Sequence, residues 1–182
     1  RQAGYAVIFG HTIGNGILHT GTRLMGYEAY YTKLLTDPSF IERLNERTLE
    51  VKIKFWDMVL SHLGNLLDIV YEMDDLGTQL GPLISPKAYR THIKPFTAKL
   101  FSFIKRKAPH IKILFHSCGS VVEFLPDFIE MGIDALNPIQ TTAKGMQLET
   151  LKKEFGHDIV FWGGGIDTEQ TLPFGTPELV KA

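Results

Sequence analysis

Short runs of apolar residues alternate with longer segments of mixed polarity along the chain. Turn-forming residues such as Gly, Pro, Asp and Ser follow closely after the runs, and these residue types end strands. The pattern predicts five strands, at Ala6–Phe9, Asp68–Met73, Ile111–Phe115, Ala135–Asn137 and Ile159–Trp162.

The segments between these runs carry apolar residues at helical spacing. The longest predicted helix begins at Asp37-Pro38 and stops at Gly64. Its apolar positions are predicted to share one face, which we expect to cover a sheet. These positions are Ile41, Leu44, Val51, Phe55 and Val59.

Three further helices are predicted. One begins at Ser85-Pro86 and resumes after Pro95, a residue that predicts a break or a kink. Another begins at Ser120, whose spacing from Glu123 is that of a capping box. The last spans Leu148–Phe155.

Strands that alternate with helices imply parallel pairing and right-handed crossovers. A doubly wound sheet and a (βα)8 TIM barrel both satisfy this pattern. Because a complete barrel needs about 250 residues, the 182 residues would form an incomplete internal portion of one, and we expect residues 1–182 to be a single domain. A helix predicted to begin at Thr176 and Pro177 also leads us to expect a piece of a longer protein.

Composition narrows the class of partner. Hydrophobic residues make up 44% and charged residues 21% of the chain, as in ordinary globular proteins. The formal net charge of -1 gives no reason to expect nucleic acid or a membrane, so a small-molecule substrate or another protein is expected. The single cysteine excludes an intramolecular disulfide, and we find no leader-like segment. A reducing cytoplasm is the simplest expected location.

Candidate chemistry collects after the predicted strands, where α/β enzymes keep their working groups. His116 and Cys118 are two positions apart, so their side chains point to the same side if the strand continues through them. Imidazole and thiolate suit zinc, which in catalytic sites takes a third protein ligand and keeps a fourth position open. The alternative is a buried cysteine beside a histidine bonded to a backbone carbonyl. The residues alone leave this choice open.

Other polar residues follow neighbouring strands. Asp74 and Asp75 could supply a catalytic carboxylate or orient a metal ligand, and alternation sends them to opposite sides, so only one is expected to face the site. Asn137, Gln140 and Asp167 could line a substrate pocket. Each of these residues also fits ordinary turn chemistry.

Five blocks of the sequence together resemble the uroporphyrinogen decarboxylase superfamily. The resemblance implies a (βα)8 barrel of which this chain covers the middle and later units. The blocks are "DDLGTQLGPLISPKAYR" (residues 74–90), "IKILFHSCGSV" (111–121), "GIDALNPIQ" (132–140), "LKKEFG" (151–156) and "FWGGGIDTEQTLPFGTPE" (161–178).

The "HSCG" block is similar to the cobalamin-dependent methyltransferase branch of that superfamily. The resemblance implies zinc on His116 and Cys118, a third ligand beyond Ala182, and methyl transfer from a corrinoid, free or carried by a partner protein, to a thiol or related acceptor. Asp74 or Asp75, with Gln79, would orient the acceptor or the zinc ligands. The alternatives are a metal-independent uroporphyrinogen decarboxylase, which uses an essential aspartate and an arginine-rich floor, and a non-catalytic corrinoid or tetrapyrrole binder.

Overall fold

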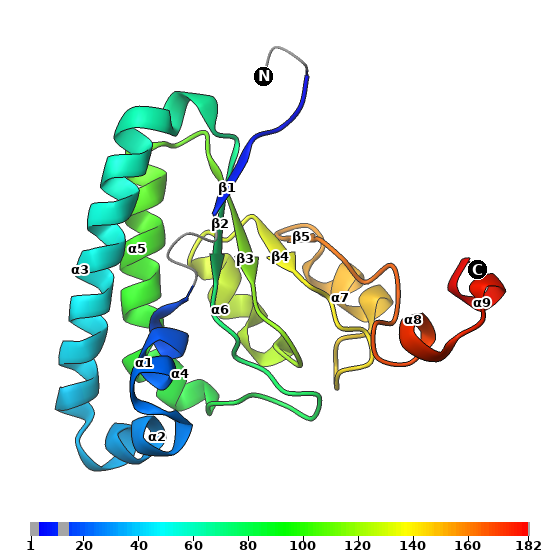
Figure 1. Ribbon diagram of the computed structural model, residues 1–182, viewed down its shortest axis with the longest axis horizontal. Helices are drawn as coiled ribbons and strands as arrows, with labels where there is room; N and C mark the ends of the chain where they lie inside the picture. The colour runs from blue at the N-terminus through cyan, green and yellow to red at the C-terminus, as the bar shows by residue number, and fades with distance from the viewer. Residues whose placement is uncertain (1–3, 11–14, 182) are drawn as a thin grey trace.

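Five parallel strands form one sheet in the computed structural model, which describes residues 4–10 and 15–181 (Figure 1). The strands lie in space in the order in which they follow along the chain, β1-β2-β3-β4-β5. Doubly wound sheets reverse their strand order at a switch point, whereas a barrel adds each strand beside the last. The fold is therefore α/β with a sheet consistent with part of a (βα)8 barrel. The strands are β1 (Ile8–Gly10), β2 (Ile69–Met73), β3 (Lys112–His116), β4 (Ala135–Asn137) and β5 (Val160–Phe161).

Helices follow the strands as the barrel pattern requires. Those in the described part of the chain are α1 (Ile17–Met25), α2 (Tyr27–Thr36), α3 (Pro38–Leu63), α4 (Pro86–His92), α5 (Lys94–Lys107), α6 (Leu125–Glu130), α7 (Leu148–Phe155), α8 (Thr171–Phe174) and α9 (Pro177–Lys181), with short 3-10 turns η1 (Gly64–Leu66) and η2 (Val122–Phe124). None of these helices is long and apolar enough to cross a membrane. Helices α3 and α5 pack side by side (Figure 1). Helices α8 and α9 lie at the side of the molecule away from α3, and none of their own residues is buried.

All five predicted strands are present, with boundaries that differ by up to two residues. The predicted range of β4 is confirmed at both ends. Strand β1 begins two residues later than predicted, and β5 is one residue shorter than predicted at each end. The break near Pro95 is confirmed, because α4 ends at His92 and α5 begins at Lys94.

The predicted capping box is wrong. The Ser120 hydroxyl donates to the carbonyl oxygen of Lys144, 24 residues away, so it does not cap the helix that follows. The chain instead makes the turn η2 before α6 begins at Leu125, and no side chain caps α6. A long-range hydrogen bond has replaced the local one that the spacing predicts.

The buried face of α3 differs in part from the predicted one. Val51 is 46% exposed, whereas Asn45 and Lys52 are buried at 0% and 2% exposure. The Lys52 ammonium lies 2.8 Å from a Glu72 carboxylate oxygen, and the Trp56 indole N–H donates to the other oxygen of the same carboxylate. Ile41 and Val59 are buried and Leu44 and Phe55 pack against the core, as predicted, so hydrophobic spacing failed only at Val51 and missed the buried polar residues. Paired charges can be buried.

The two faces of the sheet have different surroundings. Phe115 on β3 is buried against Phe101 of α5 and Phe128 of α6, with ring centroids 5.7 and 5.2 Å away. Alternation turns His116 to the other face, where the Tyr71 ring lies 6.0 Å from the imidazole. This second face corresponds to the interior of a barrel, and it carries the candidate site at the carboxyl ends of β2 and β3.

Candidate metal centre

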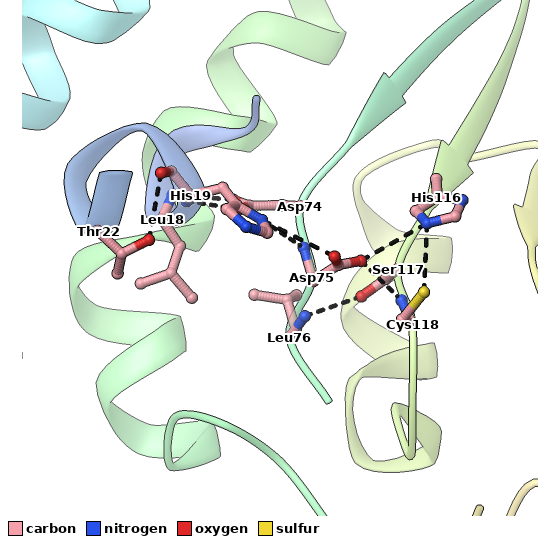
Figure 2. A network of polar contacts seen from close by, with 9 residues as sticks. All are labelled: Leu18, His19, Thr22, Asp74, Asp75, Leu76, His116, Ser117 and Cys118. Atoms are coloured by element: carbon pink, nitrogen blue, oxygen red, sulfur yellow. Dashed lines mark hydrogen bonds and ion pairs between the residues drawn. The ribbon is translucent and has the colours of Figure 1, made fainter. Parts of the chain in front are cut away.

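The loops after β2 and β3 continue the pairing of these strands beyond their ends. The N–H of Asp74 donates to the carbonyl oxygen of His116 over 2.9 Å, and the N–H of Leu76 donates to Ser117 Oγ over 3.0 Å. Figure 2 shows the two loops side by side, with their polar groups turned toward one another. The residues after β2 are thereby fixed beside the residues after β3.

Gly119 allows the second loop to turn away from the sheet. Its φ is +79°, which favours glycine, and a Cβ there would lie 2.5 Å from the carbonyl carbon of Gly77. The side-chain oxygen of Gln140 accepts a hydrogen bond from the Gly119 N–H. The positive φ and this hydrogen bond shape the turn immediately after Cys118.

Asp75, His116 and Cys118 meet in front of these loops. One ligand atom from each residue lies within 4.8 Å of the other two. Cys118 Sγ is 3.3 Å and Asp75 Oδ1 is 3.6 Å from His116 Nε2 (Figure 2). The same carboxylate oxygen accepts the Cys118 N–H over 2.9 Å, which fixes its distance from the thiol. Three different donor atoms therefore converge on one partly exposed point.

Asn137 determines which nitrogen of His116 faces this point. The amide nitrogen of Asn137 donates to the Trp162 carbonyl oxygen over 2.9 Å, so its amide oxygen is directed to His116 Nδ1, 2.8 Å away. That oxygen can only accept, and this assigns the imidazole proton to Nδ1. The lone pair of Nε2 is then directed to Cys118 and Asp75. The arrangement is typical of a metal-ligating histidine.

The chemistry of the three donors fits a divalent metal ion. Burial, and after it the neighbouring Asp75, raises the pKa of Cys118 to about 11. The thiol alone would therefore keep its proton at neutral pH, whereas a bound cation stabilises a thiolate beside a carboxylate. Oxygen, nitrogen and sulfur ligands together suit zinc. If all three residues held a zinc ion, its fourth position would be left to another molecule.

Asp74 is directed away from this point, as strand alternation predicts. It is 1% exposed, and its two carboxylate oxygens accept the N–H groups of Leu18 and His19 over 2.9 and 2.8 Å. Burial raises the pKa of Asp74 to about 7. Asp74 therefore joins α1 to the end of β2, and Asp75 is the aspartate that faces the cluster.

Comparison with known proteins places the chain in a family. The profile of the uroporphyrinogen decarboxylase (URO-D) family matches residues 15–182. The chain belongs to the URO-D family. The resemblance seen in the sequence blocks is thus confirmed at family level, although URO-D membership does not specify which reaction the chain performs. No curated protein and no solved structure matched the chain.

Two other predicted site residues of this URO-D chain make their polar contacts elsewhere. The Gln79 side chain donates to Glu169. Asp167 accepts the N–H groups of Glu169, Gln170 and Thr171 over 2.8, 3.2 and 3.3 Å, so it stabilises the turn that leads into α8. These hydrogen bonds lower the pKa of Asp167. The structure brings Asn137 and Gln140 to the cluster through His116 and Gly119, but it does not bring Asp167 there.

His19 is a neighbour of the cluster that the sequence did not indicate. The N–H of Asp75 donates to His19 Nδ1 over 3.4 Å, and the same nitrogen lies 4.0 Å from Asp75 Oδ2 (Figure 2). The side chain is 12% exposed, and burial lowers its pKa. His19 lies 56 positions before Asp75, and no local motif in the sequence links the two.

Proposed function

We propose that this URO-D family protein is a metal-dependent methyltransferase, which holds zinc through Asp75, His116 and Cys118 and transfers a methyl group from a corrinoid to a thiol or related acceptor. The observation that carries the proposal is the convergence of three ligand atoms within 4.8 Å of one another. The orientation of His116 by Asn137 supports it further, because that hydrogen bond directs Nε2 into the cluster.

Asp75 takes the position of the third ligand in this proposal. The family resemblance in the sequence implied that this ligand lies beyond Ala182. Asp75 Oδ1 lies 3.6 Å from His116 Nε2, so a small movement of the carboxylate would complete a three-ligand set within residues 15–181. Bound zinc supplies Lewis acidity that lowers the pKa of a coordinated thiol and makes it a nucleophile at neutral pH.

The protein groups around the cluster have separate tasks in the proposed reaction. His116 and Cys118 bind the metal, and Asn137 and Gln140 keep these two ligands in place. The acceptor would enter from the partly exposed barrel-interior face, where Tyr71 lies against His116.

Decarboxylation of uroporphyrinogen, the alternative reaction, would call for arginines at the site. That substrate carries many carboxylates, and the resemblance implies an arginine-rich floor to bind them. All arginines in the described part of the chain lie on helices, none on a strand or a strand-end loop: Arg23, Arg43, Arg47, Arg90 and Arg106. Arg90 pairs with Asp127 and not with the cluster.

The cofactor and partner follow from the same proposal. The methyl donor would be a corrinoid, either free or bound to a separate corrinoid protein, and the substrate would be a small molecule. Because zinc binding needs Cys118 as a reduced thiol, we expect a reducing compartment such as the cytoplasm.

The test is methyl transfer by the full-length protein. Demethylation of methylcobalamin in the presence of thiols, followed by absorbance, should require zinc and should be lost in Cys118→Ser and His116→Ala. A matched control is His110→Ala, since His110 lies just before the opposite end of β3 and contacts the Gly64 carbonyl oxygen. Release of carbon dioxide from uroporphyrinogen that survives chelation and Cys118→Ser would contradict the proposal and support decarboxylation. Spectral shifts of cobalamin without turnover would contradict it in favour of a binding protein.

A further inference from the structure

We infer that His19 is a positioning residue of this site, which holds Asp75 in the orientation needed to bind the metal. The inference rests on the proposed metal centre, to which it adds a residue from α1. Its basis is a reciprocal set of hydrogen bonds between residues 18–19 and residues 74–75.

The start of α1 is fixed to the end of β2 by Asp74. The N–H groups of the first turn of a helix have no partner within the helix, and two of them, from Leu18 and His19, donate to the Asp74 carboxylate. Gly16 permits this approach, because a Cβ there would lie 2.2 Å from Asp74 Cγ. The position of the His19 backbone is therefore set by contacts that do not involve its ring.

The His19 ring returns a contact to the neighbouring aspartate. Its Nδ1 accepts the backbone N–H of Asp75 over 3.4 Å, so the proton of the neutral ring is on Nε2. This contact fixes the backbone at the residue that carries the proposed third ligand. The ring also lies on the outer side of the Asp75 carboxylate, with Nδ1 4.0 Å from Oδ2.

The Asp75 carboxylate consequently lies between two sets of neighbours. The His19 ring fills the space beside Oδ2 without a hydrogen bond to it, whereas Oδ1 accepts the N–H of Cys118 and faces His116. Loss of the ring would leave the N–H of Asp75 without this acceptor and would open space into which the carboxylate can rotate. The distances from Oδ1 to His116 and Cys118 would then no longer be fixed, while Asp74 would still anchor α1.

The test measures metal binding by the full-length protein and not its turnover. Zinc affinity is obtained by competition with a chromophoric chelator. In the absorption spectrum of the cobalt(II) form, the thiolate-to-cobalt band reports binding by Cys118, and the d–d bands report the overall coordination geometry. His19→Leu removes the acceptor but keeps bulk, His19→Asn keeps an acceptor near the position of Nδ1, and His157→Ala changes an exposed histidine as a control. His19→Gln is a milder second variant if His19→Leu does not fold.

We expect His19→Leu to weaken zinc binding about tenfold, as loss of an outer hydrogen-bond partner commonly does. The cobalt d–d bands should change while the thiolate-to-cobalt band remains, His19→Asn should restore the spectrum, and His157→Ala should have no effect. In an Asp75→Ala background, His19→Leu should have no further effect, because His19 acts through Asp75.

Wild-type affinity and an unchanged cobalt spectrum in His19→Leu would overturn the inference and leave the metal site intact. An equal loss of affinity in the Asp75→Ala background would also overturn it, since His19 would then act on the fold in general. Absence of the thiolate band in the wild-type protein would contradict the metal site itself, and the inference with it.

Discussion

Replacement of Asn137 by alanine tests how the protein prepares His116 for a metal. The Asn137 side-chain amide makes one 2.8 Å hydrogen bond to His116 Nδ1. Loss of such an outer partner typically weakens metal binding by about 10–100-fold. Because His116 is partly exposed and water can replace the lost acceptor, we expect a value near the lower end. About tenfold corresponds to about 1.4 kcal/mol.

Two measurements check this expectation for Asn137→Ala. Competition with a chromophoric chelator gives the zinc dissociation constant, and ¹⁵N NMR of the metal-free protein gives the tautomer of His116. We expect weaker zinc binding together with a loss of the preference for a proton on Nδ1. Asn65→Ala, at an exposed position in η1, is the matched control and should change neither quantity. Zinc affinity within twofold of wild type in a folded Asn137→Ala protein would show that Asn137 does not prepare His116 for the metal.

Three more predictions concern the thiol, its loop and the buried ion pair. Since burial, and after it Asp75, raises the pKa of Cys118 to about 11, zinc must displace the thiol proton, and zinc affinity should rise about tenfold per pH unit between about pH 7 and 9. Calorimetry in buffers of different ionisation enthalpy measures that proton, and a pH-independent affinity would contradict the prediction. Gly119→Ala should destabilise the fold by about 1–3 kcal/mol more than Gly132→Ala in denaturant unfolding, because both glycines have a φ of +79° but only the first meets a backbone atom within 3 Å. An equal loss of stability in the two variants would show that the close approach at Gly119 is not what destabilises Gly119→Ala. Lys52→Ala should lower the free energy of unfolding by about 3–5 kcal/mol, since it leaves the buried Glu72 carboxylate without its cation. The control Lys54→Ala, at an exposed position, should lower it by less than about 0.5 kcal/mol. Similar losses of stability in both variants would argue against a stabilising buried ion pair.

Much of the fold could be predicted because it depends on local signals. Apolar runs located the strands, and strand alternation placed His116 and Cys118 on one side, where the structure has their ligand atoms 3.3 Å apart. The choice between a doubly wound sheet and a barrel was not local. It needed the strand order, which depends on how segments far apart in the chain pair.

The site was less predictable, since it depends on register between strands. The pairing of His116 with Asn137 across β3 and β4 sets up their side-chain hydrogen bond, and the pairing of Met73 with His116 places Asp75 beside Cys118. Neither register can be derived from the composition of one strand. His19 was missed because no sequence pattern links helix α1 to the end of β2, where α1 contacts both Asp74 and Asp75.

Buried polar residues were the other source of error. Hydrophobic spacing selected Val51 for the covered face of α3, whereas the structure buries Lys52 there beside Glu72. A charged residue is predicted to be exposed unless a partner for its charge is known. The partner of Lys52 is Glu72, which lies 20 positions further along the chain on β2.

Zinc K-edge X-ray absorption on the full-length protein tests the metal centre most directly. We expect one sulfur neighbour at about 2.3 Å and nitrogen or oxygen neighbours at about 2.0–2.2 Å, with imidazole scattering from a single histidine. Cys118→Ser should remove the sulfur shell. A protein that retains no zinc after purification and reconstitution, or one whose zinc has only oxygen and nitrogen neighbours, would contradict the assignment of Asp75, His116 and Cys118 as a metal site.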